Sequence, residues 1–336
     1  MIFLRRITLV FPRPKGGGTP LKNLLCAPAR RAGAHLPMMM NLTDKNEIRA
    51  LLQRHGFRFS KSLGQNFLCA GWVPERTAEA AEADKDTGVL EIGPGAGCLT
   101  RELSLRAGKV LSVERDESLR SVLAETLAGC ENVTVFFGDA LKTDLVALVR
   151  EELTGFEKLA VCANLPYAIT TPLLTKLTEA GCFQRITVMV QREVARRICA
   201  RENTAEYGAF TVLMQWRCRA EMLFDVPPQC FVPAPKVTST VIRLDLRETP
   251  PCPVRDEALM FRIIRAAFNQ RRKTLMNALA GGLGGRFEKA DIAAAIAGVG
   301  LDERVRGEAL GIAQFAALAD ALAAGVDGTS CTPPNR

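Results

Sequence analysis

The sequence predicts an α/β protein, in which a doubly wound parallel sheet is followed by a small all-helical domain. Two observations lead to this prediction. From residue 87 onward, short apolar segments alternate with segments of helical period, which is the pattern of right-handed strand–helix–strand units. After residue 255 no strand pattern recurs, and the chain is rich in Ala and Leu at helical spacing.

Five buried strands are expected in the first part, each followed by a helix. The expected strands cover residues 88–93, 109–114, 132–139, 158–164 and 185–191. The expected helices cover residues 97–107, 117–128, 143–153 and 171–180, with an Arg-rich helix after residue 191. Because no helix separates residues 218–226 from residues 236–246, these two stretches are expected to close the sheet as an antiparallel pair.

Residues 1–39 differ from the rest of the chain, because they are basic, rich in Pro and Gly, and without periodicity. A disordered RNA-binding arm, a targeting peptide and a start codon read too far upstream all fit this composition. We favour a mis-annotated start or a dispensable disordered extension, because the segment lacks the apolar region of a secretory signal. The stretch "NLTDKNEIRALL" after Met40 indicates the first helix, with Thr43 as its expected cap.

Changes in composition also divide the remaining chain. Residues 40–246 hold the strand–helix pattern and are expected to form the first domain. The stretch "RETPPCPV" is typical of a linker, and it begins the helical domain expected over residues 247–325. Residues 326–336 are expected to be a disordered tail.

Composition limits the classes of function. The two histidines cannot build a metal site, and the eleven cysteines include no C-x-x-C pair. This pattern argues against zinc and against a disulfide framework, and it fits a reducing cytosol. No apolar run approaches the roughly 18 residues of a membrane helix. We therefore expect a cytoplasmic protein without a metal ion or a membrane partner.

The basic charge is concentrated in a few places. Seven of the cations lie within residues 1–37, which have no acid, so the net charge of +8 falls to about +1 without them. Two further clusters lie within residues 185–201 and residues 261–273. Each cluster is compatible with a solvated helix face or with a nucleic-acid surface. The second cluster contains Arg262, Arg265, Arg271, Arg272 and Lys273.

A glycine-rich turn after the first strand indicates a nucleoside cofactor. The turn begins at Gly93 and has the form G-x-G-x-G, whereas a dinucleotide fingerprint would need glycine where Cys98 stands. This form is typical of sites for S-adenosylmethionine. Glu114, at the end of the second strand, is suited to bind ribose hydroxyls, and Asp139, at the end of the third, can accept the adenine amino group. Either acid alone could be a helix cap, and the absence of a Walker G-K-[ST] motif disfavours ATP.

The corner Asn164-Leu165-Pro166-Tyr167 follows the fourth strand, beside the same expected crevice. On its own it has the composition of an ordinary turn. Next to a cofactor site, the Asn164 side-chain carbonyl and the Leu165 backbone carbonyl could accept the hydrogens of a base amine and favour its pyramidal form. Tyr167 could stack on a base that has left its helix. We therefore expect methyl transfer to an amine, by positioning rather than by acid–base chemistry.

With these residues assembled, the chain resembles the ribosomal small-subunit RNA adenine N6,N6-dimethyltransferases. The resemblance runs from residue 40 to about residue 320 and depends on seven ordered motifs. They are "KSLGQNFL" (61–68), "EIGPGAGCLT" (91–100), "VERD" (113–116), "GDAL" (138–141), "NLPYAITTP" (164–172), "FVPAPKVTS" (231–239) and "FNQRRKTLMNAL" (268–279).

The resemblance implies a Rossmann-like class I methyltransferase domain with a helical RNA-binding domain after it. It implies S-adenosylmethionine-dependent dimethylation of two adjacent adenosines in the 3′-terminal hairpin loop of 16S rRNA, by a monomer acting on a pre-small (30S) ribosomal subunit. It places Phe231 near the target base. The cofactor contacts that it implies are Asn66, Leu68, Gly93, Glu114, Asp139 and Asn164.

Three alternatives remain open at this point. Large-subunit rRNA adenine methylases share the crevice and the Asn-x-Pro-[Tyr/Phe] corner, although "FVPAPKVTS" and "RRKTLMNAL" favour the small-subunit enzymes. DNA adenine methylases usually carry Asp-Pro-Pro-Tyr at the corner. A ribosome-assembly or transcription factor without catalysis would not need the intact set of site residues. The chain departs from the family pattern in residues 1–39 and at Ala168, so a polar contact at that position is not expected.

Overall fold

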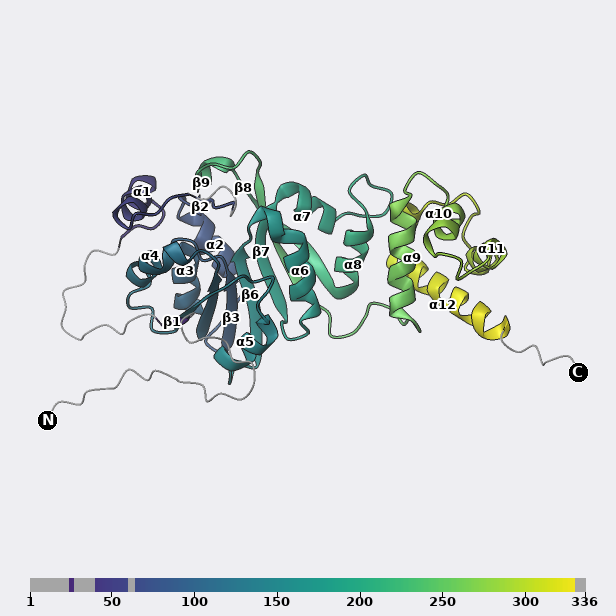
Figure 1. Ribbon diagram of the computed structural model, residues 1–336, viewed down its shortest axis with the longest axis horizontal. Coiled ribbons are helices and arrows are strands. Elements are labelled where there is room, and N and C mark those ends of the chain that lie inside the picture. Colours follow the sequence, from purple (N-terminus) through teal and green to yellow (C-terminus); the bar gives the residue numbers. More distant parts are fainter. Residues whose placement is uncertain (1–23, 27–39, 60–63, 330–336) are drawn as a thin grey trace, which may run out of the picture.

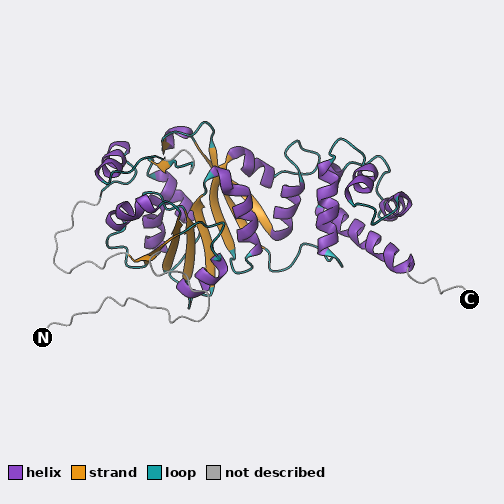
Figure 2. Cartoon of the chain, viewed as in Figure 1, coloured by secondary structure: helices purple, strands orange, loops and turns teal. Residues whose placement is uncertain are grey.

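The computed structural model describes residues 24–26, 40–59 and 64–329. A domain built on a large mixed sheet and a domain of helices lie side by side along the long axis of the molecule (Figure 1). Helices cover both faces of the sheet, as Figure 2 shows. The expected α/β architecture with a helical C-terminal region is therefore confirmed.

The large sheet has the strand order β1-β5-β4-β3-β6-β7-β10-β8. Strands β3 to β7 are parallel, and β10 runs antiparallel to both β7 and β8. The direction of winding reverses at β3, because β4 lies on one side of it and β6 on the other. The strands are β1 (Leu24–Cys26), β3 (Thr87–Ile92), β4 (Lys109–Glu114), β5 (Val133–Phe137), β6 (Lys158–Asn164), β7 (Arg185–Gln191), β8 (Cys218–Val226) and β10 (Ser239–Leu246).

Alternate residues of the central strands enter two different cores. Leu90 and Leu111 face one core, formed with the helices that follow β5 and β6. Val89 and Val110 face the other, formed with the helices before β3 and after β3 and β4. The first core packs on α5 (Leu145–Glu152), α6 (Thr170–Glu179) and α7 (Arg192–Ile198). The second packs on α1 (Lys45–Arg54), α2 (Trp72–Ala80), α3 (Cys98–Arg106) and α4 (Arg120–Thr126).

The helical domain shares a core with the end of the first domain. The linking helix is α8 (Ala209–Arg217), whose Trp216 ring packs edge-on against Phe261, with 6.2 Å between ring centroids. Tyr207 is fully buried, and its hydroxyl donates to the Leu310 carbonyl at 2.8 Å. These contacts fix the position of the helical domain on the sheet domain. Its helices are α9 (Glu257–Asn269), α10 (Leu275–Gly282), α11 (Lys289–Gly298) and α12 (Ile312–Thr329).

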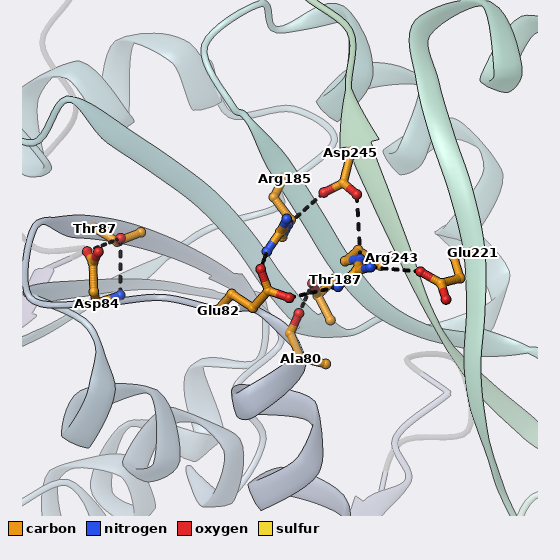
Figure 3. Close-up of polar contacts among 9 residues, drawn as sticks. All are labelled: Ala80, Glu82, Asp84, Thr87, Arg185, Thr187, Glu221, Arg243 and Asp245. Atoms are coloured by element: carbon orange, nitrogen blue, oxygen red, sulfur yellow. Dashed lines mark hydrogen bonds and ion pairs between the residues drawn. The ribbon is translucent and has the colours of Figure 1, made fainter.

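A charged network joins four elements at the amino end of β7 (Figure 3). Glu82, which follows α2, pairs with Arg185 on β7 and with Arg243 on β10, the latter at 2.8 Å. Asp245 contacts the same two arginines at 2.7 Å and 3.5 Å, and Glu221 on β8 contacts Arg243 at 2.8 Å. The network ties α2 to the sheet at the end opposite the carboxyl ends of the parallel strands.

The structure differs from the sequence-based expectations in local details. The cap of α1 is Asp44 rather than Thr43, because the Asp44 carboxylate accepts from the Asn46 and Glu47 amides at 2.8 Å and 2.9 Å. Residues 24–26 were expected to be disordered, but they pair with β5. Without them, the backbone groups of β5 would be unpaired at the edge of the sheet. Helix α8 was not predicted, and α12 continues to Thr329, beyond the expected end of the helical domain at 325.

Candidate active site

A single pocket lies at the carboxyl ends of β3, β4, β5 and β6, beside the reversal of winding, where open α/β sheets bind ligands. It encloses about 1160 Å³ of space, including open solvent at its mouth. Eight of the nine candidate residues line it together, although they come from five separate stretches of the chain. They are Asn66, Leu68, Gly93, Glu114, Asp139, Asn164, Leu165 and Tyr167.

The glycine-rich turn forms the floor of this pocket. Gly93 has a φ of +72° and Gly95 a φ of +57°, a backbone region that side chains disfavour. A Cβ atom at Gly95 would also stand 3.4 Å from the Phe67 ring, which packs over the turn. The Gly93 amide donates to the Val113 carbonyl at 2.9 Å, so the turn is tied to the end of β4. The backbone can therefore approach a ligand closely without a side chain between them.

Glu114, at the end of β4, is a buried carboxylate in the wall of the pocket. Its side chain accepts from the Asp116 amide at 2.7 Å, and its residue exposure is only 6%. Burial is the main reason that its pKa is raised to about 7, against the opposing effect of backbone donors at Asp116 and Gly95. No cation forms an ion pair with it within the described residues. A buried carboxylate of this kind is suited to accept hydrogen bonds from ligand hydroxyls.

Asp139, after β5, is held in place by its own turn. One of its carboxylate oxygens accepts from the Leu141 amide at 3.0 Å, and the other lies 3.7 Å from Nε of Arg115. The Gly138 amide donates to the Glu114 carbonyl at 2.7 Å, which joins the ends of β4 and β5. The two predicted carboxylates therefore belong to adjacent, hydrogen-bonded strand ends.

The stretch before α2 closes the pocket from the N-terminal side. The Gln65 amide donates to the Asp116 carboxylate at 2.6 Å, which connects this stretch to the loop after β4. Phe67 and Leu68 form β2 (Phe67–Leu68), which pairs with β9 (Phe231–Val232). Asn66 lies beside β2, and its amide donates to the Gly64 carbonyl at 3.0 Å. The described stretch Gly64–Leu68 thus forms one wall.

Phe231 is the one candidate that does not line the pocket. It is opposite Leu68 in the β2–β9 pair, is 2% exposed, and packs against Val73 and Met189 in a separate small core. Its position supports Leu68 from behind. The sequence could not show whether Phe231 lines the pocket or lies in this small core, because an apolar residue beside a short strand is compatible with both positions.

The Asn164–Tyr167 corner stands opposite Glu114 and Asp139 across the pocket. The Leu165 amide donates to the Met189 carbonyl at 3.1 Å, which fixes the peptide between Asn164 and Leu165. The Asn164 side chain is half-buried and has no hydrogen-bond partner within the described part of the chain, so its amide is available to a ligand. Tyr167 begins a short 3-10 turn, and its hydroxyl shares a hydrogen bond of 2.6 Å with Ser239.

Sequence reasoning assigned no role to three residues at the site, Glu91, Asp116 and Ser239. Glu91 lines the pocket but is 1% exposed, and its carboxylate accepts from Thr100 and Ser112 at 2.7 Å and 2.6 Å. Burial raises its pKa to about 7, although the two hydroxyl donors oppose this shift. The sequence does contain a signal for Glu91, which is the one acid within the apolar strand "GVLEIG". A buried acid needs hydrogen-bond donors, so this acid could have been predicted to have polar partners.

Within residues 24–26, 40–59 and 64–329, no group of three or more His, Cys, Asp and Glu side chains could hold a metal ion. Over the same ranges, no helix has the length and apolar character needed to cross a membrane.

The chain is similar to known ribosomal RNA methyltransferases. The family model described as Ribosomal RNA adenine dimethylase matches residues 56–323. Two relatives, from Geobacillus kaustophilus and Streptococcus sanguinis, are named Ribosomal RNA small subunit methyltransferase A. Each of them is 44% identical to this chain. These alignments cover 85% and 84% of this chain, and 98% of each relative.

Solved structures give the same fold. The crystal structure of the 23S rRNA methyltransferase ErmE is 28% identical, with a TM-score of 0.59, and the match covers 77% of this chain and all of that one. A dimethyladenosine transferase from Plasmodium falciparum has a TM-score of 0.60 at 24% identity, covering 74% of this chain and 94% of that one. The sheet domain therefore has the class I methyltransferase fold.

Proposed function

Because the chain belongs to the ribosomal RNA adenine dimethylase family and is an rRNA methyltransferase, we propose that it dimethylates N6 of two adjacent adenosines in the 3′-terminal hairpin loop of 16S rRNA. We propose that it does so in the cytoplasm, as a monomer, on a pre-30S subunit. One observation carries the proposal: the Asn164–Tyr167 corner and the carboxylates of Glu114 and Asp139 line the same pocket.

The pocket fits S-adenosylmethionine as the methyl donor. The Gly93 turn leaves the backbone open to a ligand, and Glu114 is a buried carboxylate without a cationic partner in the described structure. Glu114 would hold the ribose hydroxyls, and Asp139 would accept the adenine amino group. Asn66 and Leu68 would cover the ligand from the N-terminal wall. When bound there, the cofactor supplies an electrophilic methyl group.

The Asn164 corner would orient the amine of the target adenine. An aromatic amine is a poor nucleophile while its lone pair is delocalised into the ring. The Asn164 Oδ1 atom and the Leu165 carbonyl would accept its two hydrogens and favour the pyramidal geometry. The hydrogen bond from the Leu165 amide to Met189 holds this peptide in place, so the acceptors are oriented before the base arrives. Tyr167 would stack on the base.

The small ribosomal subunit is the favoured substrate. The relatives named as small-subunit enzymes are 44% identical over nearly their full length, whereas the 23S enzyme ErmE is 28% identical. This difference supports 16S rRNA over the large-subunit alternative.

The helical domain would bind RNA phosphates through a hollow between α9 and α10. Its lining contains Arg262, Arg265, Asn269 and Arg286 and no acidic residue. None of the three arginines forms an ion pair within the described residues. Arginine groups without acidic neighbours are suited to phosphate contacts.

The direct test is incubation of the purified protein with labelled S-adenosylmethionine and undermethylated small subunits, with large subunits as the control. Mass spectrometry of the digested RNA should locate N6,N6-dimethyladenosine at two adjacent positions of the 3′-terminal hairpin loop. Labelling of the large-subunit RNA alone, or of another nucleoside, would overturn the proposal.

A further inference from the structure

We propose that Ser239 is a positioning residue for the methyl transfer, because it holds the ring of Tyr167 in the orientation that receives the target base. The proposal rests on the proposed function, in which Tyr167 stacks on an adenine. It gives a role to the last residue of the "FVPAPKVTS" motif, which does not line the pocket.

The hydroxyl groups of Tyr167 and Ser239 are hydrogen-bonded to each other. The Tyr167 hydroxyl oxygen lies 2.6 Å from Oγ of Ser239, and either group can be the donor. Within the described structure neither hydroxyl has a second hydrogen-bond partner. Ser239 is completely buried, so water cannot replace Tyr167 as its partner. An unpaired buried hydroxyl is costly, and both groups therefore gain from keeping the bond.

Ser239 is the rigid member of this pair. It is the first residue of β10 and is placed between two neighbouring strands, opposite Gln191 on β7 and Val226 on β8. The Arg192 amide also donates to the Thr238 carbonyl at 3.0 Å, directly before it. The sheet therefore fixes the position of its Oγ atom.

Tyr167, in contrast, does not belong to the sheet. It begins a single 3-10 turn, lies half-buried at the pocket, and has no aromatic ring packed against it in the described residues. Burial raises the pKa of its phenol, which stays protonated and able to donate. The bond to Ser239 is thus the directional contact that fixes where the long axis of the ring points.

The substitution Tyr167→Phe distinguishes the two roles of this residue, which are stacking on the base and holding the ring in position through Ser239. A phenyl ring offers the same stacking surface, since stacking on a base needs only the ring. If Tyr167 acted by stacking alone, Tyr167→Phe would keep full activity. If the bond to Ser239 fixes the ring, Tyr167→Phe and Ser239→Ala should cause the same loss, and the two losses should not add.

The experiment is a double-mutant cycle on undermethylated small subunits, with Ser239→Ala, Tyr167→Phe, the double variant and Ser239→Thr. Each single variant should lower kcat by about 3- to 10-fold, the range expected for one hydrogen bond. KM for the subunit and the affinity for S-adenosylmethionine should change by less than about twofold, because Tyr167→Phe keeps the stacking ring and Ser239 does not line the pocket. The double variant should have the same kcat as the single variants. Ser239→Thr should have the wild-type kcat, because it keeps the hydroxyl group.

Several outcomes would overturn the proposal. Full kcat in Tyr167→Phe would leave stacking as the only role of the ring, and additive losses would show that the two residues act separately. A loss of cofactor affinity in Ser239→Ala would indicate a general structural role. If Ser239→Ala does not fold, Tyr167→Phe tests the same bond from the other side. A wild-type protein that does not methylate the subunit would refute the proposed function itself, whereas an active wild type with unaffected variants would refute only the role of Ser239.

Discussion

Glu114 shows how much a single residue depends on its surroundings. In the sequence it is one acid among many at the end of an apolar segment. In the structure it is almost fully buried in the wall of a pocket, and among the described residues only backbone amides donate to it. A carboxylate without a cation at such a place needs further donors, and ribose hydroxyls are the donors that the proposed cofactor offers.

Replacement of Glu114 should therefore weaken cofactor binding. We expect Glu114→Ala to lower the affinity for S-adenosylmethionine by about 10- to 100-fold, because hydrogen bonds to a charged group contribute roughly 1.5–3 kcal/mol. Titration calorimetry measures this directly. Glu151→Gln, at an exposed position of α5, is the control and should bind normally. Equal affinity of Glu114→Ala and the control would disprove the ribose assignment.

Asn164 should separate binding from chemistry. Asn164→Ala removes the acceptor proposed for the target amine, so we expect turnover to fall by about 100-fold or more, the order seen when one preorganised polar group is removed from an active site. Cofactor should still bind, because Glu114 and Asp139 remain. Single-turnover methylation and calorimetry on the same preparation give both quantities. Turnover at the wild-type rate would contradict the role of the amide.

At the scale of elements, the turn between α9 and α10 illustrates why the partners of each residue in a basic segment have to be known. In the sequence, Arg271, Arg272 and Lys273 belong to a basic cluster that is compatible with a nucleic-acid surface. In the structure, Arg271 is committed to Glu308 at 2.6 Å and to the Ala205 and Thr204 carbonyls at 2.7 Å and 2.8 Å. It joins the helical domain to the loop before α8, so its guanidinium group already has three partners within the protein.

Removal of two charges from the α9–α10 hollow should reduce the salt dependence of RNA binding. We expect the double substitution Arg262→Gln, Arg265→Gln to lower the slope of log K against log salt by about 1 to 2, because each lost phosphate contact removes a little under one unit. Filter binding to small-subunit RNA over a range of salt concentrations measures the slope. Arg150→Gln on α5 removes one charge at an exposed position away from the hollow and is the control for a general loss of charge. An unchanged slope in the double variant would remove the hollow from the RNA interface.

The network around Glu82 should matter for stability and not for catalysis. It connects α2 with β7 and β10 at the end of the sheet away from the pocket (Figure 3). We expect Glu82→Ala to lower the free energy of unfolding by about 1–2 kcal/mol, since it leaves Arg185 and Arg243 with fewer partners in a shared network. Denaturant titration measures the change, and kcat should stay within twofold. A large loss of kcat at normal stability would show that the network acts on the pocket.

At the scale of the whole molecule, buried carboxylates make the stability depend on pH. Glu91 has a folded-state pKa of about 7, raised from 4.5 mainly by burial. Because the folded protein favours the protonated acid, this group stabilises fully below pH 4.5, and the contribution is lost as pH rises through 7. Glu91→Gln keeps an acceptor for Thr100 and Ser112 without the charge.

We therefore expect Glu91→Gln to be more stable than the wild type at pH 8, by an amount on the order of 2–3 kcal/mol. The difference should shrink toward pH 5, where the wild-type acid is protonated in the folded state. Denaturant titrations of both proteins at pH 5, 6, 7 and 8 give the comparison. Parallel pH profiles for the two proteins would mean that Glu91 is not the titrating group.

The strand–helix order, the class of fold and most of the pocket residues follow from the amino-acid sequence alone. Strand periodicity, the G-x-G-x-G turn and residues at strand ends are local properties, and parallel strands bring their carboxyl ends to one edge. This is why Gly93, Glu114, Asp139 and Asn164 could be grouped before any coordinates were known.

Which side chains already have partners is known only from the three-dimensional arrangement of the chain. It placed Phe231 behind Leu68, gave Arg271 to Glu308, and brought Ser239 to Tyr167, which precedes it by 72 residues. Such pairings depend on the register between strands and on the packing of domains, which no local pattern encodes. The physical reason is that availability is set by the partners of a group, and partners come from distant parts of the chain.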